Sequence, residues 1–313
     1  MMTKYLLSLV LFFALLPAAD AGAAKVRIVV ESPTGLQQKV YMTRPAGLTA
    51  ERPIVIVMHG MRRNADEYRD QWHELAKEHN FLLVVPEFSE RFFPGSEAYN
   101  LGNVFDASGK PQPKAAWSFS AIEPIFDAVR RRFHMTARGY ALYGHSAGAQ
   151  FVHRFLFHVP TARVTRVVAA NAGWYTMPVF NVAFPYGLRD SVVSSADLAA
   201  ALQLPVTVLL GGQDIDPQHR SLNRSPEALL QGSHRHARGQ AFFDSAADAS
   251  NRLGVPFGWQ LLTVPEADHD NRLMAPAALP LLLEPAHSER LPPAPVPVPG
   301  EERLPATLPD TGP

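Results

Sequence analysis

Residues 140–158 read YALYGHSAGAQFVHRFLFH, and this stretch decides the fold that we expect for the chain. Tyr140–Tyr143 are apolar or aromatic and predict a short buried strand, whereas Ala149–His158 predict a helix. Gly144 and Gly148 enclose Ser146 in the spacing Gly-x-Ser-x-Gly. In a tight strand-to-helix turn of this kind, the glycines leave room around a strained serine, whose hydroxyl is then exposed. We therefore predict that Ser146 is a nucleophile, with an ordinary tight turn as the alternative.

The rest of the chain alternates apolar runs with longer amphipathic stretches. This alternation predicts an α/β fold, with a mostly parallel central sheet and helices on both of its faces. We expect strands at residues 26–31, 39–43, 53–58, 81–85, 140–143, 164–170, 206–210 and 259–264. We expect helices at residues 68–78, 119–133, 149–158 and 240–253. Residues 87–114 predict a long loop, and residues 174–204 an irregular segment that arches over a cleft.

A serine hydroxyl is a poor nucleophile at neutral pH unless a base activates it and a third group orients that base. Asp214 follows the expected strand Val206–Leu210, in the sequence Gly-Gly-Gln-Asp. Catalytic groups of α/β folds collect at the carboxyl ends of the strands, so we predict that Asp214 is the acid. Asp216 remains the alternative, although Asp216-Pro217 is typical of a turn.

The expected base is His269, in the polar segment Glu-Ala-Asp-His-Asp after the last expected strand. The order Ser146, Asp214, His269 agrees with the order of serine, acid and histidine in α/β-hydrolases. The alternative is a histidine without a catalytic role. His234 and His236 have no carboxylate or cysteine near them in the sequence, so we expect neither a metal site nor any other cofactor.

The oxyanion formed during acyl transfer needs two backbone N–H donors. One is expected from Ala147, directly after the nucleophile, and the other from Met61 in the loop after residues 53–58, with Arg62 as the alternative donor. The side chains of Arg62 and Arg63 either meet an acidic group of the substrate or lie in solvent.

The composition narrows the class of partner. The chain has 313 residues, which is compatible with one catalytic domain. Its 29 Lys and Arg balance its 29 Asp and Glu, so it lacks the basic surplus of a nucleic-acid-binding protein. It contains no cysteine, which excludes disulfides and cysteine-ligated metals.

The two ends of the chain differ from its body. Residues 1–23 combine Lys4, an apolar run and several small residues, which predicts a signal peptide cleaved after Ala21 or Ala23 and a secreted or periplasmic location. A retained N-terminal anchor is the alternative, but the run is short for a membrane span and we expect no stable anchor. We assign residues 24–283 to the catalytic domain. Residues 284–313 are rich in proline and predict a disordered tail.

Five segments together resemble the secreted esterase branch of the α/β-hydrolases, which includes poly(3-hydroxybutyrate) depolymerase-like and feruloyl-esterase-like proteins. They are His59-Gly60 with Asn64–Tyr68, Phe81–Phe88, Gly144–Gly148, Gly211–Asp214 and Asp268–Asp270. The resemblance implies a metal-free serine esterase acting on a small or oligomeric ester. The chain differs from many extracellular depolymerases because it has no cysteine and no separate polymer-binding domain, which argues against action on a solid polymer.

Trp174 and Tyr175 follow the expected strand 164–170 and are candidate substrate contacts, unless they pack in the core. Three functions remain open beside ester hydrolysis. The same Ser-His-Asp arrangement serves peptidases and acyltransferases, and a binding protein can keep the fold without catalysis.

Overall fold

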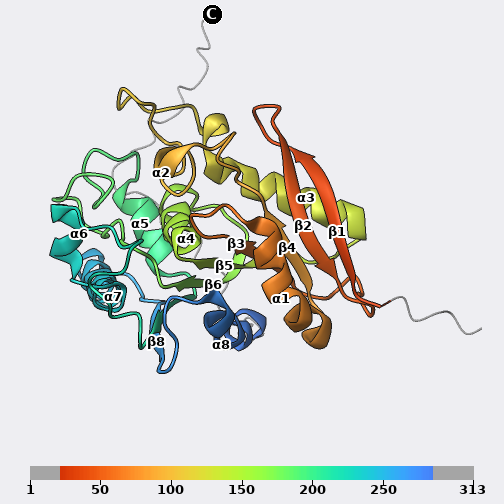
Figure 1. The fold of residues 1–313 in the computed structure, drawn as a ribbon. Coiled ribbons are helices and arrows are strands. Elements are labelled where there is room, and N and C mark those ends of the chain that lie inside the picture. Colours follow the sequence, from red (N-terminus) through yellow and green to blue (C-terminus); the bar gives the residue numbers. More distant parts are fainter. Residues whose placement is uncertain (1–21, 285–313) are drawn as a thin grey trace, which may run out of the picture. The chain divides into compact units, whose positions relative to one another are not determined.

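Eight strands form one mixed sheet in the order β1-β2-β4-β3-β5-β6-β7-β8 (Figure 1). The computed structural model describes residues 22–284, so nearly all of the predicted signal peptide and the Pro-rich tail lie outside it. The strands are β1 (Ala24–Glu31), β2 (Gln37–Arg44), β3 (Ile54–Met58), β4 (Leu82–Pro86), β5 (Tyr140–His145), β6 (Val164–Ala170), β7 (Val206–Gly211) and β8 (Gln260–Val264). β1 pairs antiparallel with β2 and β2 with β4, whereas every other pair is parallel. The predicted α/β fold is confirmed.

Helices cover both faces of this sheet. They are α1 (Ala65–His79), α2 (Gly95–Ala98), α3 (Ile122–Phe133), α4 (Ala147–His158), α5 (Ser195–Leu202), α6 (Pro226–Gln231), α7 (Arg235–Leu253) and α8 (Asn271–Leu283), with short 3-10 turns at Lys114–Ala116 and Ser118–Ala121. Helices α3, α4, α5 and α7 share one apolar core with the sheet, and α1 and α8 share the other. None of the helices within residues 22–284 is long and apolar enough to cross a membrane.

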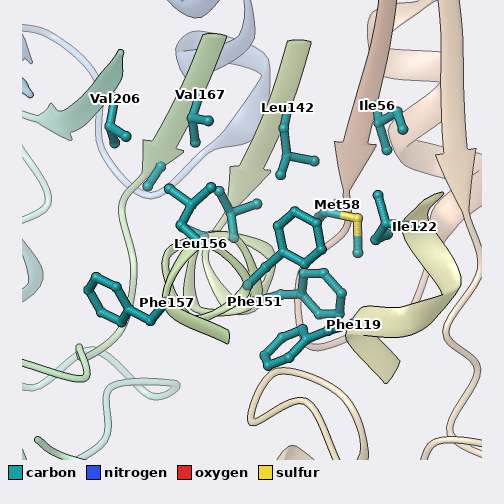
Figure 2. Packing of buried hydrophobic residues seen from close by; sticks show 14 of the residues in the cluster. Ile56, Met58, Phe119, Ile122, Leu142, Phe151, Leu156, Phe157, Val167 and Val206 are labelled. Carbon is teal, nitrogen blue, oxygen red and sulfur yellow. The ribbon is translucent and has the colours of Figure 1, made fainter. Parts of the chain in front are cut away.

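Strands β3, β4 and β5 are buried along their whole length, because helices cover both faces of the sheet. Alternate residues of four neighbouring strands, Ile56, Leu142, Val167 and Val206, face the side of α4 that carries Phe151 (Figure 2). The residues between them belong to the opposite core, against α1 and α8. Because side chains alternate along a strand, a continuous apolar run is what a sheet covered on both sides requires.

Five helices differ from the sequence prediction. The short helices α2 and α6 were not expected, and α2 lies inside the segment 87–114 that was predicted to be a loop. Helix α5 lies inside the segment 174–204 that was expected to be irregular, and Ser194 and Asp197 form a capping box at its start. Helix α7 begins at Arg235 rather than at residue 240, with the ring of His234 accepting the N–H of Ala237. Helix α8 was not predicted, since it contains two prolines, which remove backbone donors.

Candidate active site

Ser146 occupies a strained turn between β5 and α4. Its backbone angles are φ 58° and ψ −117°, a conformation that is costly for a residue with a side chain. A Cβ atom on Gly144 would overlap the backbone of Gly148, and a Cβ on Gly148 would overlap the carbonyl of Met58. The two glycines of the motif therefore allow the backbone segments around Ser146 to pack at this distance.

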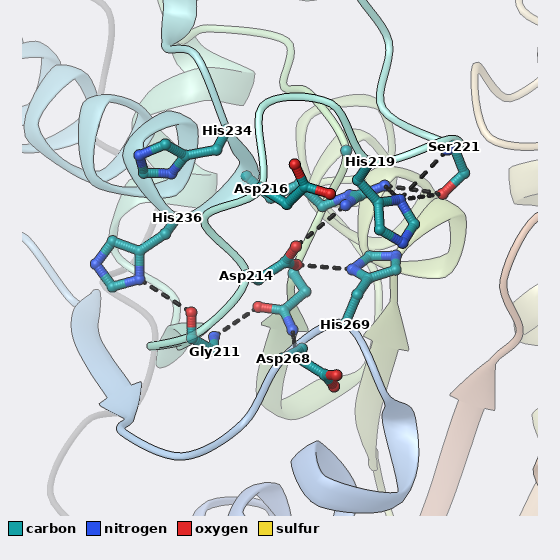
Figure 3. A network of polar contacts seen from close by, with 12 residues as sticks. Gly211, Asp214, Asp216, His219, Ser221, His234, His236, Asp268 and His269 are labelled. Atoms are coloured by element: carbon teal, nitrogen blue, oxygen red, sulfur yellow. Dashed lines mark hydrogen bonds and ion pairs between the residues drawn. The ribbon is translucent and has the colours of Figure 1, made fainter.

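Three residues from different strand ends form a hydrogen-bonded series. The Oγ atom of Ser146 lies 3.0 Å from Nε2 of His269, and Nδ1 of His269 lies 2.7 Å from Oδ2 of Asp214. With its proton on Nδ1, His269 donates to the carboxylate and accepts from the hydroxyl of Ser146. Figure 3 shows the contact between the carboxylate and the imidazole. This geometry is suited to withdrawing a proton from Ser146.

Asp214 and Asp216, the two candidates for the acid, have different surroundings in the structure. Asp214 is 4% exposed and contacts His269, whereas Asp216 is exposed and its Oδ1 accepts the backbone N–H of Gln218. The latter contact is a turn interaction of the kind expected from Asp216-Pro217.

A buried cation contacts the second oxygen of Asp214. Nη1 of Arg235 donates to Oδ1 of Asp214 at 3.1 Å, and the two side chains are 1% and 3% exposed. Burial acts to raise the pKa of Asp214. The hydrogen bond with His269 and the charges of His269 and Arg235 outweigh burial, so the pKa lies below its ordinary value of 3.8. The carboxylate is therefore held in its ionised form.

Two further histidine rings flank His269. The ring centroid of His145 lies 4.9 Å from that of His269, and the centroid of His219 lies 5.6 Å away. Burial holds the pKa of His145 well below its usual value. Burial also lowers the pKa of His219, and the charge of Arg235 lowers it further. Both rings are thus neutral at neutral pH, and neither adds a positive charge beside His269.

The loop after β3 lies directly against the serine. A Cβ atom on Gly60 would lie 3.8 Å from Cβ of Ser146. His59 fixes this loop, because its Nε2 accepts the N–H of Phe88 at 3.0 Å and its Nδ1 donates to the carbonyl of Gly60 at 3.0 Å. Burial lowers the pKa of His59 to about 4, so the ring keeps this neutral form. Hydrogen bonds on both ring nitrogens hold the loop beside Ser146.

A cavity of about 480 Å³ opens beside Ser146. Met61 and Ala147, the two predicted oxyanion donors, both line it. Within residues 22–284, the N–H groups of Met61 and Ala147 donate to no backbone carbonyl. Both positions thus have a backbone donor without a backbone partner next to the serine.

Trp174 and Tyr175 have different surroundings. Trp174 lines the cavity, with the guanidinium of Arg154 4.2 Å from the centre of its ring. Tyr175 is fully buried and its ring stacks on Phe242 at 4.3 Å between centroids. Tyr175 is not among the residues that line the cavity, so the structure places it in the core.

The cavity wall carries more positive than negative charge. It includes Arg63, Arg220, Arg235 and one carboxylate, Glu90. Arg63 donates to the carbonyls of Phe88 and of Gly95, each at 2.7 Å, and its guanidinium is thereby fixed. Arg220 makes no hydrogen bond or ion pair with another residue of the described region. Its guanidinium is available to a ligand in the cavity.

Local sequence reasoning missed Arg235, His219 and Ser221, because no motif surrounds them and their contacts arise only in the folded chain. Among residues 22–284, no three His, Cys, Asp or Glu side chains lie close enough to hold a metal ion. His234 caps α7, and Nδ1 of His236 donates to the carbonyl of Gly211 at 3.1 Å.

Solved structures that are similar to this chain include two with substantial sequence identity. Poly(aspartic acid) hydrolase-1 from Sphingomonas sp. KT-1 has a TM-score of 0.81 and 44% identity, over 84% of this chain and 99% of that one. LpqC, a poly(3-hydroxybutyrate) depolymerase from Bordetella parapertussis, has a TM-score of 0.77 and 38% identity, over 82% of this chain and 90% of that one. The serine hydrolase FphF of Staphylococcus aureus shares the fold alone, with a TM-score of 0.52 and 16% identity over 82% and 96% of the chains.

No protein-family model matches the chain, and no curated protein matches it. The two similar structures nevertheless cover most of the chain, and they confirm the resemblance that the sequence motifs indicated. The chain belongs to the α/β-hydrolase-fold hydrolases, in the branch that includes poly(aspartic acid) hydrolase-1 and the poly(3-hydroxybutyrate) depolymerase LpqC.

Proposed function

We propose that the protein is a serine hydrolase that cleaves carboxylic esters through an acyl-enzyme, with Ser146, His269 and Asp214 as its catalytic triad. The observation that carries the proposal is the continuous series from Oγ of Ser146 through His269 to the carboxylate of Asp214. Oγ of Ser146 attacks the acyl carbon while Nε2 of His269 takes the hydroxyl proton. His269 then gives the proton to the departing alkoxide. In the second half of the reaction, water attacks the acyl carbon while His269 takes its proton, and His269 returns that proton to Oγ of Ser146 as the acyl group leaves.

The developing oxyanion needs donors that are fixed before the reaction. We assign this role to the backbone N–H groups of Ala147 and Met61, because both residues line the cavity beside Ser146. The two ring contacts of His59 support this assignment, since they hold the loop that carries Met61. Each such donor contributes on the order of 10²-fold to 10³-fold in kcat in other serine hydrolases.

The substrate class rests on the relatives and on the cavity. One relative is a poly(3-hydroxybutyrate) depolymerase, and the cavity volume of about 480 Å³ lies within the usual range of small-ligand pockets, roughly 300–1,000 Å³. We therefore propose a small or oligomeric ester as the substrate. The proposed reaction requires no metal or organic cofactor. On the composition of residues 1–23, we place the mature protein outside the cytoplasm, as a secreted or periplasmic enzyme.

A second candidate is hydrolysis of an amide-linked acidic polymer by the same triad. The relative that shares 44% identity is a poly(aspartic acid) hydrolase. Arg220 on the cavity wall has no partner in the described region and carries the charge that a carboxylate-bearing chain would contact. This candidate realises the peptidase alternative left open by the sequence.

One assay set tests the proposal and separates the two candidates. Purified protein is incubated with p-nitrophenyl butyrate and, separately, with poly(aspartic acid), and Ser146→Ala is run as the matched control. Turnover of the ester that disappears in Ser146→Ala supports ester hydrolysis. Cleavage of poly(aspartic acid) without ester turnover supports the second candidate. If Ser146→Ala keeps the activity that the wild type shows, the assignment of Ser146 as the nucleophile is contradicted.

A further inference from the structure

We propose that Arg235 is a positioning residue for the reaction: it orients the carboxylate of Asp214 and anchors the cavity-lining segment 219–221. The inference rests on the proposed function of the triad. Arg235 is the first residue of α7 and comes from outside every motif that the sequence offered.

The guanidinium of Arg235 links two parts of the site. Nη1 donates to Oδ1 of Asp214 at 3.1 Å. Nη2 donates to Oγ of Ser221 at 2.9 Å and lies 3.2 Å from Nδ1 of His219. Ser221 lines the cavity. A single rigid group therefore fixes the triad carboxylate on one side and the cavity wall on the other.

The carboxylate depends on this contact for its orientation. Within residues 22–284, Oδ2 of Asp214 bonds His269 and Oδ1 bonds Arg235, so the two partners determine the plane of the carboxylate. A carboxylate with one partner alone can rotate, and proton transfer is sensitive to displacements of about 1 Å. Because both side chains are almost fully buried, loss of the cation leaves Oδ1 of Asp214 without a side-chain partner within residues 22–284, and His269 alone then contacts the charge.

The charge around Asp214 makes the contribution of Arg235 measurable. Besides His269, the titratable groups that act on the carboxylate are Arg235 and His234 of α7 and its cap, His219 of the loop after β7, and Tyr175 after β6. Two further groups face its partners: His145 of β5 acts on His269 and Arg235, and Asp216 acts on His219. Arg235 is the cation that contacts the carboxylate directly. Without it, the pKa of Asp214 rises, and the Asp214–His269 pair takes up its proton at a higher pH.

The experiment compares pH profiles of kcat/KM on p-nitrophenyl butyrate for the full-length protein and four variants. Arg235→Gln removes the positive charge. Arg235→Lys keeps the charge but lacks the two-nitrogen guanidinium that contacts Asp214 and Ser221 together. Ser221→Ala removes the contact with the cavity wall and leaves the Arg235–Asp214 contact. Arg238→Gln is the matched control. Arg238 is also a buried arginine of α7, but among the described residues it donates to the carbonyls of Gly173, Asn223 and Gly232 and to no carboxylate.

We expect the acid limb of Arg235→Gln to move upward by about one pH unit and kcat at the optimum to fall about tenfold. We expect the acid limb of the kcat/KM profile to stay at the wild-type pH in the other three variants, Arg235→Lys, Ser221→Ala and Arg238→Gln. If Arg235→Gln does not fold, as judged by circular dichroism, Arg235→Met replaces it as a neutral variant with no polar group to bury.

Two failures are distinguishable. If the neutral variants lose activity with an acid limb that coincides with the wild-type limb, Arg235 is merely structural and the inference is overturned. An equal upward shift in Arg238→Gln overturns it as well. If turnover by the wild type does not depend on Ser146, the proposed function itself fails, whatever the variants of Arg235 do.

Discussion

Oγ of Ser146 lies 3.0 Å from Nε2 of His269, although 123 positions separate the two residues in the chain. The sheet order explains how they meet. β5, which precedes Ser146, and β8, which precedes His269, are parallel members of one sheet, separated by β6 and β7. Asp214 follows β7, so all three residues leave the sheet at the carboxyl ends of its strands. The hydrogen-bonded series is therefore a consequence of strand order.

The two neighbouring aspartates give a matched pair of variants. Asp214→Asn removes the negative charge beside His269 and favours the wrong tautomer, so we expect kcat to fall by about 10³-fold to 10⁴-fold. Asp216→Asn changes only an exposed turn, and we expect less than about a twofold effect. Steady-state kinetics on p-nitrophenyl butyrate compare them. Equal losses in both variants would contradict the assignment of Asp214.

The motif glycines are expected to tolerate no added methyl group. In Gly148→Ala the new Cβ would overlap the carbonyl of Met58, which is backbone and cannot move aside cheaply. We expect the free energy of unfolding to fall by about 1–3 kcal/mol and ester turnover to decrease. Gly47→Ala is the control, since its Cβ would meet only the end of the Asn80 side chain, at 3.1 Å, and no backbone. Urea unfolding measures both, and wild-type stability in Gly148→Ala would refute the packing argument.

Much of the fold was readable from the sequence, since strands buried on both faces must be continuously apolar. The Gly-x-Ser-x-Gly spacing likewise predicted the turn at Ser146, because only glycine satisfies the close approach of Gly148 to Met58. Helix α8 was not predicted because Pro276 and Pro280 lie inside it, and proline normally ends a helix. It forms nevertheless, and its apolar face packs against the sheet.

The parts of the site that the sequence did not predict depend on contacts between residues far apart in the chain. Arg235 bonds Asp214 across 21 positions, and nothing local to either residue predicts the pair. Tyr175 was a candidate substrate contact because it follows a strand, but its ring packs on Phe242 in the core. Proximity along the chain to a strand end thus predicts the region of a side chain and not the direction in which it points.

Arg220 and Arg224 test the preference for acidic substrates. Arg220 lines the cavity without a partner in the described region, whereas Arg224 donates to Oε1 of Gln218 at 3.1 Å. We expect Arg220→Gln to lower kcat/KM on poly(aspartic acid), relative to a neutral ester, by about fivefold at low salt. Arg224→Gln should leave this ratio unchanged. A ratio that is independent of Arg220 would argue against an acidic substrate in this cavity.

Buried histidines should make the fold sensitive to mild acid. Burial lowers the pKa values of His59, His145, His153 and His158, to about 4 in His59 and His158, from the ordinary 6.5. Below pH 6.5 the unfolded chain binds protons that the folded chain does not, so the free energy of unfolding falls as pH falls toward 4.

Substitution of single histidines shows which of them cause the dependence of the free energy of unfolding on pH. Each such histidine contributes up to about 1.4 kcal/mol per pH unit, and we expect His158→Phe to reduce the slope of stability against pH between 6 and 5. The exposed His79, replaced by Asn, is the control and should leave the slope unchanged. Urea unfolding at each pH gives both slopes, and an unaltered slope in His158→Phe would show that burial does not hold that ring neutral.

The most direct test of the account is covalent labelling of Ser146. The purified protein is treated with a fluorophosphonate, which reacts with activated serines, and the modified peptide is identified by mass spectrometry. We predict one adduct on Ser146, absent in Ser146→Ala and strongly slowed in His269→Ala. No adduct, or an adduct on another serine in the folded wild-type protein, would contradict the claim that Ser146, His269 and Asp214 form the catalytic site.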